Sequence, residues 1–147
     1  MKDVPSGASF VVCALRKCMN NFPLGKPANS LAARLSEEKL ARIIDVLVTK
    51  MSTDMMIGFH FTKVDLNRLR ALELQHARDA LFGTATYEGR PIATAHRPHR
   101  VFGGSFDRRI KLLSDILIAH QVDEDIRAHW IAHQQALRSQ VVQGDCA

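Results

Sequence analysis

The sequence predicts an all-α fold, and three observations support this prediction. Apolar residues recur three and four positions apart in four separate segments, which is the spacing of one helix face. A hydroxyl or carboxylate side chain stands before each segment, where it can bind the free N–H groups of a helix start. No segment alternates apolar and polar residues as a strand would. With 147 residues, the chain is expected to form one domain with a core of its own.

The first two long helices are predicted over residues 36–51 and 65–81, with a break at residues 52–54 after the first. Ser36 can cap the first, and two glutamates follow it, where negative charge favours a helix start. Asp65 can cap the second, and Gly83 can end it because glycine readily adopts the left-handed conformation. Their apolar stripes are Leu40, Ile43, Ile44, Leu47, Val48 and Met51, and Leu66, Leu69, Leu72, Leu74, Ala77, Ala80 and Leu81.

Two connections separate the long helices. Residues 55–61, which include a glycine, are too few to form a long helix and are predicted to make a corner. Residues 82–104 contain four glycines and two prolines, so they leave room for one short helix over residues 91–96. Pro91 suits the first turn of that helix, and Pro98 prevents it from continuing.

Two further long helices complete the predicted domain. Ser105 is expected to cap the third, whose apolar stripe is broad enough to be well buried. The acidic residues 123–125 are expected to open the fourth, which continues to Val141. The two stripes are Phe106, Ile110, Leu112, Leu113, Ile116 and Leu117, and Ile126, Trp130, His133, Leu137 and Val141.

Residues 1–34 are predicted to form a loosely ordered extension, and residues 35–147 the folded domain. The extension holds three of the five prolines and no sustained apolar period. Its apolar run spans only about six residues, which is too short for the core of a secretory signal. Cys13, Cys18 and Cys146 make an odd count, so a disulfide framework is not expected. We therefore predict a cytoplasmic protein.

Composition and charge narrow the classes of function. No window approaches about 18 consecutive apolar residues, so no membrane span is expected. A formal net charge of +5 allows a nucleic-acid partner without requiring one. Such basic residues also cover solvated helix faces, and no helix-turn-helix spacing stands out. The alternative of a basic helical nucleic-acid-binding module would use Arg68, Arg70, Arg78, Arg108, Arg109 and Lys111, together with Arg16 and Lys17 in the extension.

Three histidine arrangements are candidates for chemistry. Glu73 and His76 share a helix face as in di-iron bundles, but such a bundle needs this pair twice and no second pair exists. His129 and His133 have a spacing that can chelate a metal, but no third ligand lies nearby, so a solvated pair is expected. His96 ends the predicted short helix, and a histidine in such a turn is an ordinary loop residue unless its context indicates otherwise.

The context of His96 provides that indication. The stretch from Tyr87 reads Tyr-Glu-Gly-Arg-Pro-Ile-Ala-Thr-Ala-His, and it resembles the Tyr-x-Gly-x-Pro-hydrophobic-x-x-x-His segment of the truncated haemoglobins, most similar to their first group. Nine positions separate Tyr87 from His96 and ten more lead to Phe106, as in that family. Upstream, Phe61 and the helix after it resemble the family's haem-facing phenylalanine and distal helix. The resemblance covers about residues 36–141.

The resemblance implies a two-over-two helical globin sandwich that holds haem b (iron protoporphyrin IX), with His96 as the proximal iron ligand. The other ring nitrogen of such a ligand usually donates to a backbone carbonyl, which the short helix can supply. Val101 and Phe106 would line the proximal side and Phe61 the opposite face, while Tyr87 would approach a haem propionate. A rim guanidinium could pair with a propionate as well, from Arg90, Arg97 or Arg100.

The sequence also departs from the family. The glycine pair between the first two family helices is missing, so the entry to the first matched helix must turn differently. On the distal side, Val48 and Glu73 replace the usual tyrosine and glutamine, with Leu69 at the gate. An ionised carboxylate only accepts hydrogen bonds, so Glu73 could donate one only if burial raised its pKa. His76, one turn away, is a second candidate as a donor or iron ligand, or a helix histidine without either role.

These residues predict a haem protein that reversibly binds dioxygen or a related diatomic gas such as nitric oxide. Nitric oxide dioxygenation would need an electron donor, and we expect any such activity only with a separate reductase. A globin-like sensor or interaction domain without haem is a further alternative to the nucleic-acid-binding module.

Overall fold

The structure is a computed structural model that describes residues 34–84 and 87–143. Within these ranges the chain forms helices and no strand, so the predicted all-α class is confirmed. The α-helices are α3 (Glu37–Thr53), α4 (Leu66–Phe82), α5 (Ile92–His96), α6 (Gly103–Ala119), α7 (Glu124–Ala136) and α8 (Arg138–Val141). Two short 3₁₀ helices, η1 (Gly58–Phe61) and η2 (Arg97–His99), lie in the connections.

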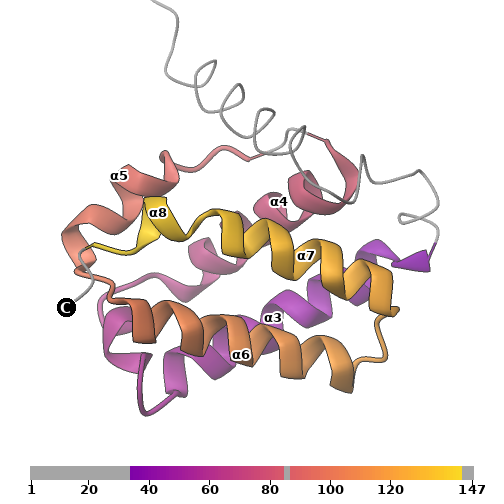
Figure 1. Ribbon diagram of the computed structural model, residues 1–147, viewed down its shortest axis with the longest axis horizontal. Coiled ribbons are helices and arrows are strands. Elements are labelled where there is room, and N and C mark those ends of the chain that lie inside the picture. Colours follow the sequence, from indigo (N-terminus) through magenta and orange to yellow (C-terminus); the bar gives the residue numbers. More distant parts are fainter. Residues whose placement is uncertain (1–33, 85–86, 144–147) are drawn as a thin grey trace, which may run out of the picture.

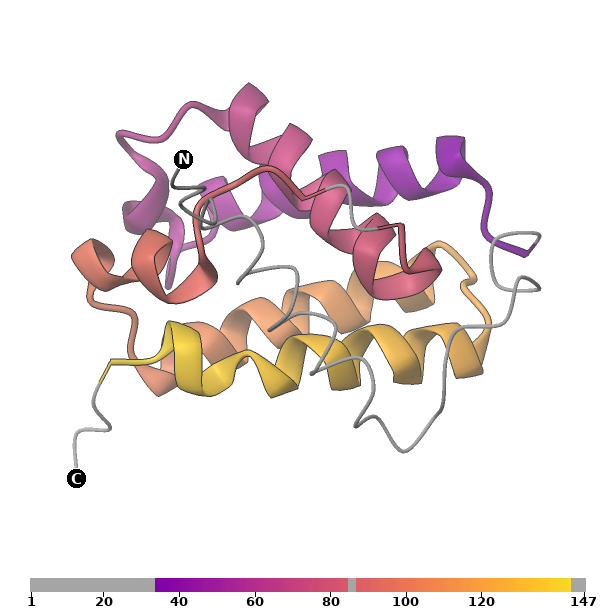
Figure 2. The same ribbon diagram turned by 90° about the horizontal axis from the view of Figure 1, so that it is seen from above.

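The four long helices form two layers. Helix α3 packs against α4 and α6, and α7 packs against α6 and α4. Figure 1 shows α6 and α7 running side by side, and Figure 2 shows α3 and α4 in one layer above them. The short helix α5 packs against α8 at one end of the molecule. This is the predicted two-over-two sandwich.

Local capping chemistry sets the helix starts that the sequence predicted correctly. The Ser36 hydroxyl accepts a hydrogen bond from the Lys39 N–H at 3.2 Å. Oδ1 of Asp65 accepts from the N–H groups of Asn67 and Arg68 at 3.0 and 3.2 Å. Gly83 ends α4 with a φ of 65°, in the left-handed region that glycine tolerates without strain.

Replacing Asp65 by alanine is expected to lower the free energy of unfolding by about 1 kcal/mol, because two N–H groups of α4 lose their acceptor. Urea denaturation followed by circular dichroism measures this loss. Asp65→Asn retains a side-chain oxygen and should lose much less. Equal losses in both variants would show that the cap does not carry the effect.

Two predicted helix boundaries are wrong. Helix α6 begins at Gly103, two residues before the expected cap, and Ser105 lies inside its first turn with its Oγ 3.4 Å from Nε2 of His60. The last predicted helix ends at Ala136, and after Leu137 the chain continues as the separate helix α8. At both places the helix begins without a side-chain cap.

The main core lies between the two layers and contains the predicted stripe of α3, with Trp130 of α7 only 2% exposed. A second, smaller cluster lies below α5 and consists of Val101, Phe106, Leu137 and Val141. Arg34, the first described residue, pairs with Asp123 and Asp125 at the start of α7. Residues 1–33 of the predicted extension, with Cys13 and Cys18, lie outside the described residues, as does Cys146. In the described part, no helix is long and apolar enough to cross a membrane.

Candidate functional site

A largely apolar cavity of about 240 Å³ opens between the two layers, beside α5. Helices α3, α4, α5, α6 and α7 all contribute to its walls, together with η1. Eight of the nine residues that the sequence singled out line it: Phe61, Leu69, Glu73, His76, Tyr87, His96, Val101 and Phe106. The ninth, Val48, is fully buried in the main core and does not line this cavity. Its place on the inner face of α3, toward the other helices, accounts for the difference.

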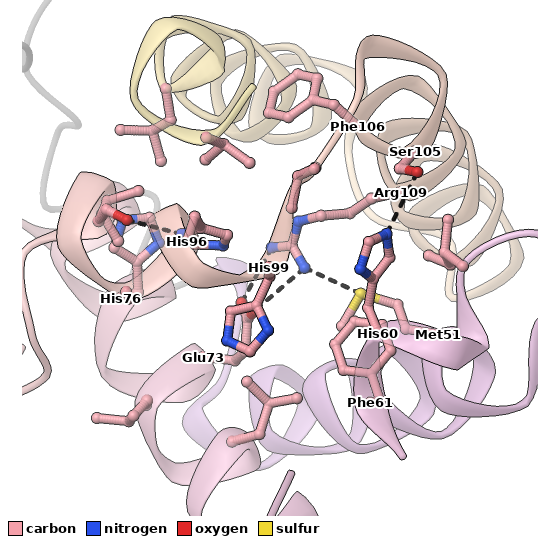
Figure 3. Close-up of a pocket in the computed structure, with 18 of the residues that line it drawn as sticks. Met51, His60, Phe61, Glu73, His76, His96, His99, Ser105, Phe106 and Arg109 are labelled. Carbon is pink, nitrogen blue, oxygen red and sulfur yellow. Dashed lines mark hydrogen bonds and ion pairs between the residues drawn. The ribbon is translucent and has the colours of Figure 1, made fainter. Parts of the chain in front are cut away.

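His96 is held in a defined orientation at the end of α5. Its Nδ1 donates to the carbonyl oxygen of Ile92 at 2.8 Å, one turn back in the same helix. Figure 3 shows the opposite edge of the ring directed into the cavity. Among the described residues, Nε2 of His96 makes no hydrogen bond. Burial lowers the pKa of His96, so the neutral imidazole, the form that binds metals, is favoured.

The C-terminal segment braces this end of the cavity. The side-chain amide of Gln143 donates to the carbonyl oxygen of His96 at 2.8 Å, and the Gln143 backbone N–H donates to the carbonyl of Val101 at 2.9 Å. Val101 and Phe106 are 9% and 4% exposed, and both line the cavity. Sequence reasoning missed Gln143, because no local pattern connects it with residues more than forty positions earlier.

A bidentate ion pair between α4 and α6 lines the cavity. Nη1 and Nη2 of Arg109, on α6, each lie 3.0 Å from one carboxylate oxygen of Glu73, on α4 (Figure 3). Nη2 also donates to Oε1 of Gln134 at 2.9 Å, and Nη1 lies 3.0 Å from the sulfur of Met51. The Arg109 and Glu73 side chains are 21% and 18% exposed, so the pair is mostly buried.

The ion pair corrects the sequence-based idea that Glu73 could be protonated. Burial alone would raise the pKa of Glu73, but the positive charge of Arg109 and the hydrogen bonds it donates outweigh this effect and hold that pKa below its ordinary value. Glu73 is therefore an ionised acceptor. Arg109 entered the sequence analysis only as a basic surface residue. The missed signal is its position: three residues after Phe106, a charged side chain interrupts the buried face of the helix.

His76 lies deeper along α4 and is 6% exposed. Its ring packs edge-on against the rings of Tyr87 and His133, with centroids 5.6 and 5.2 Å apart. Its Nε2 is buried and has no hydrogen-bond partner among the described residues. Burial lowers the pKa of His76, with Glu73 opposing this effect, so a neutral ring is favoured at the cavity wall.

The expectation that His129 and His133 form a solvated pair is wrong. They are 7% and 2% exposed because their face of α7 packs against α4. Nε2 of His129 donates to the carbonyl oxygen of Ala80 in α4 at 2.9 Å. Burial lowers the pKa of His133 to about 3, with the neighbouring His76 and His129 adding to the shift.

The buried His133 is expected to make the protein less stable as the pH falls. Its folded pKa of about 3 lies below the usual unfolded value of about 6.5, so between these values only the unfolded chain takes up the proton. The full contribution of His133 to the free energy of unfolding is present above pH 6.5. Each pH unit below this value lowers that free energy by about 1.4 kcal/mol. Urea unfolding from pH 7 to pH 4 measures this slope.

His133→Gln should flatten the slope by one proton. A slope that His133→Gln does not alter would show that another group causes the acid sensitivity.

The mouth of the cavity is polar and mostly exposed. His60 and His99 line it, and the Tyr87 hydroxyl donates to the carbonyl oxygen of Arg90 at 2.9 Å. Arg90, Arg97 and Arg100 are exposed. Within residues 34–84 and 87–143, no cluster of histidine, cysteine and carboxylate side chains could hold a metal ion by itself.

Comparison with known proteins identifies the fold. No protein-family model matches the sequence, and no curated protein does either. Among solved structures, the truncated haemoglobin of Tetrahymena pyriformis matches with a TM-score of 0.72 at 16% identity, covering 78% of this chain and 98% of that one. Chlamydomonas reinhardtii THB1 matches with a TM-score of 0.68 at 24% identity, covering 80% and 99%. The chain therefore has the fold of the truncated haemoglobins.

Proposed function

We propose that this chain is a haem-binding globin of the truncated haemoglobin family, with haem b in the cavity and His96 as the iron ligand. The observation that carries this proposal is the setting of His96. One ring nitrogen is fixed by the Ile92 carbonyl, and the other faces a largely apolar cavity without a partner in the described chain. That arrangement determines the tautomer and leaves Nε2 as the ligand atom.

The other residues of the cavity fit haem. Its walls are mostly apolar, as suits a flat apolar group, and Val101 and Phe106 would pack near the ligand histidine while Phe61 lies on α3's side of the cavity. Gln143 would keep the backbone of His96 in place. When bound, haem would supply an iron with an open position for a small ligand. The contribution of this chain is to hold that iron, exclude water and determine which ligands enter.

We assign dioxygen or a related diatomic gas such as nitric oxide as the ligand. We also propose that the chain is most similar to the first group of the truncated haemoglobins. Tyr87 and the segment to His96 support that assignment, while Val48 and Glu73 stand where that group often has other residues. Turnover of nitric oxide would require a separate reductase. We place the protein in the cytoplasm, on the grounds of its cysteine pattern.

The nucleic-acid-binding alternative loses its main support. Of the six helix residues on which it relied, five pair with carboxylates: Arg70, Arg78, Arg108, Arg109 and Lys111. Arg16 and Lys17 lie outside the described residues. Arg109 lies inside the cavity rather than on a surface that could follow a phosphate backbone.

Titration of the purified protein with haemin, followed by visible spectroscopy, tests the proposal. We expect a Soret band that saturates at one haem per chain and a ferrous form that binds carbon monoxide. A chain that forms no specific Soret band after haemin addition would leave the haem-free sensor or interaction domain as the better assignment.

A further inference from the structure

The proposed haem site assigns no role to the Arg109–Glu73 pair, although this bidentate ion pair lines the cavity. The two terminal nitrogens of Arg109 bind both oxygens of Glu73, and they also meet Gln134 and Met51. One side chain of α6 thereby contacts α3, α4 and α7. The guanidinium is held by side chains from three other helices and cannot easily turn toward another ligand.

The two terminal nitrogens of Arg109 form a fork, and this fork is a binding site for a planar oxyanion. A guanidinium offers parallel N–H groups whose spacing matches the two oxygens of a carboxylate or a similar V-shaped anion. Here both positions are taken by the carboxylate of Glu73, with N–O distances of 3.0 Å on each side. An anion that enters the cavity from solution would need the same N–H groups and would meet the negative charge of Glu73.

We propose that Glu73 is an internal anion that blocks the Arg109 fork, so that the cavity rejects small anions and admits uncharged ligands. This inference rests on the proposed function, because it assigns neutral diatomic gases as the ligand class. It makes Glu73 a specificity-determining residue rather than a hydrogen-bond donor.

The burial of the pair explains why the effect should be large. If Glu73 lost its charge, Arg109 would be a cation with about a fifth of its surface exposed and no counter-charge in the fork. An uncompensated buried charge is strongly unfavourable, and an anion from solution would relieve it. The cavity would change from one that excludes anions to one that attracts them.

The neighbouring residue on the same helix provides a matched control. Arg108 also binds a carboxylate through two nitrogens, with Nε and Nη2 at 3.0 and 2.7 Å from Asp54. Arg108, however, is 35% exposed and does not line the cavity, so water can solvate its charge if the partner is neutralised. Asp54→Asn should therefore remove an ion pair without creating an anion site.

The first test uses the chain without haem and measures thermal unfolding in formate and in formamide, its uncharged counterpart, at constant ionic strength. Formate at about ten times its Kd should raise the Tm of Glu73→Gln by about 5 °C. It should raise the Tm of the wild type and of Asp54→Asn far less, and formamide should have little effect on any chain. The double variant Glu73→Gln/Arg109→Met should lose the response to formate.

The second test uses the ferric, haem-loaded protein and compares the Kd for azide with the Kd for neutral imidazole by spectral titration. In Glu73→Gln the ratio of the azide Kd to the imidazole Kd should fall about tenfold or more, as expected for a gained bond to a charged donor. Glu73→Asp keeps the negative charge but places it one methylene farther from Arg109, so this variant should fold. Its ratio of the azide Kd to the imidazole Kd should lie between those of the wild type and Glu73→Gln.

Equal formate responses in wild type and Glu73→Gln would overturn the inference, and so would an unchanged ratio of azide to imidazole affinity. If Glu73→Gln folds in formate but not in formamide, that result directly supports the inference that Glu73 occupies an anion site. The two tests also separate this inference from the proposed function. A wild type that binds no haem would refute the haem assignment, while the formate measurement would still decide whether Glu73 blocks an anion site.

Discussion

His96→Ala is expected to abolish the specific Soret band that haemin gives with the wild type. The reason is geometric: Nε2 of His96 faces the cavity, and the bond from Nδ1 to the Ile92 carbonyl holds the ring in that orientation. Loss of groups that merely orient a metal ligand costs about 10- to 100-fold in affinity. Loss of the ligand itself should cost at least about 100-fold, measured by competition for haemin with an acceptor protein.

His120→Ala is the matched control for this experiment. His120 makes the same bond, with Nδ1 donating to the carbonyl of Ile116 four residues earlier at 2.9 Å, but it does not line the cavity. Its replacement should leave haem affinity unchanged. Added imidazole should restore the band in His96→Ala by occupying the vacated space. A full-strength band in His96→Ala without imidazole would show that another residue binds the iron.

Arg109→Met should lower the free energy of unfolding by about 2 to 4 kcal/mol. The substitution leaves the Glu73 carboxylate buried without its counter-charge and also removes the donor to Gln134. The range lies slightly below that for fully buried pairs, because Glu73 is 18% exposed and keeps some solvation. Urea unfolding of the haem-free chain measures the loss.

The pH dependence identifies the cause of that loss. Without Arg109, burial should raise the pKa of Glu73, so the variant should approach the wild type in stability as the pH falls toward 5 and Glu73 takes up a proton. The double variant Glu73→Leu/Arg109→Met should recover most of the loss, and Lys111→Met, which breaks an exposed pair on the same helix, should change little. A constant loss across this pH range would locate the effect in packing rather than in the ion pair.

Local chemistry explains which parts of the fold could be predicted. Ser36 and Asp65 bind N–H groups two or three residues away, and Gly83 ends its helix through its own backbone conformation. These interactions are complete within a few residues, so they are visible in the sequence. The start of α6 at Gly103 and the break at Leu137 are different, because no nearby side chain caps either point.

In the candidate site, too, the features set by local spacing could be predicted from the sequence, and those set by distant packing could not. Eight of the nine proposed residues line one cavity, because the resemblance carried onto the chain both the spacing from Tyr87 to Phe106 and the positions of Phe61 and the helix after it. The prediction of a solvated pair at His129 and His133 was wrong, because two polar residues four positions apart do not reveal which face of their helix is packed. Helix α4, distant in sequence, covers that face.

By itself, the sequence determined the four long helical segments, the caps at Ser36, Asp65 and Gly83, and the setting of His96, whose carbonyl partner lies one turn back on the same helix. Only the tertiary structure decided what Glu73 and Arg109 do. They are 36 positions apart on different helices, and their charges meet because α4 and α6 face one cavity. A buried charge takes its pKa and its role from whichever partner the fold brings within hydrogen-bond distance, and the order of residues along the chain does not specify that partner.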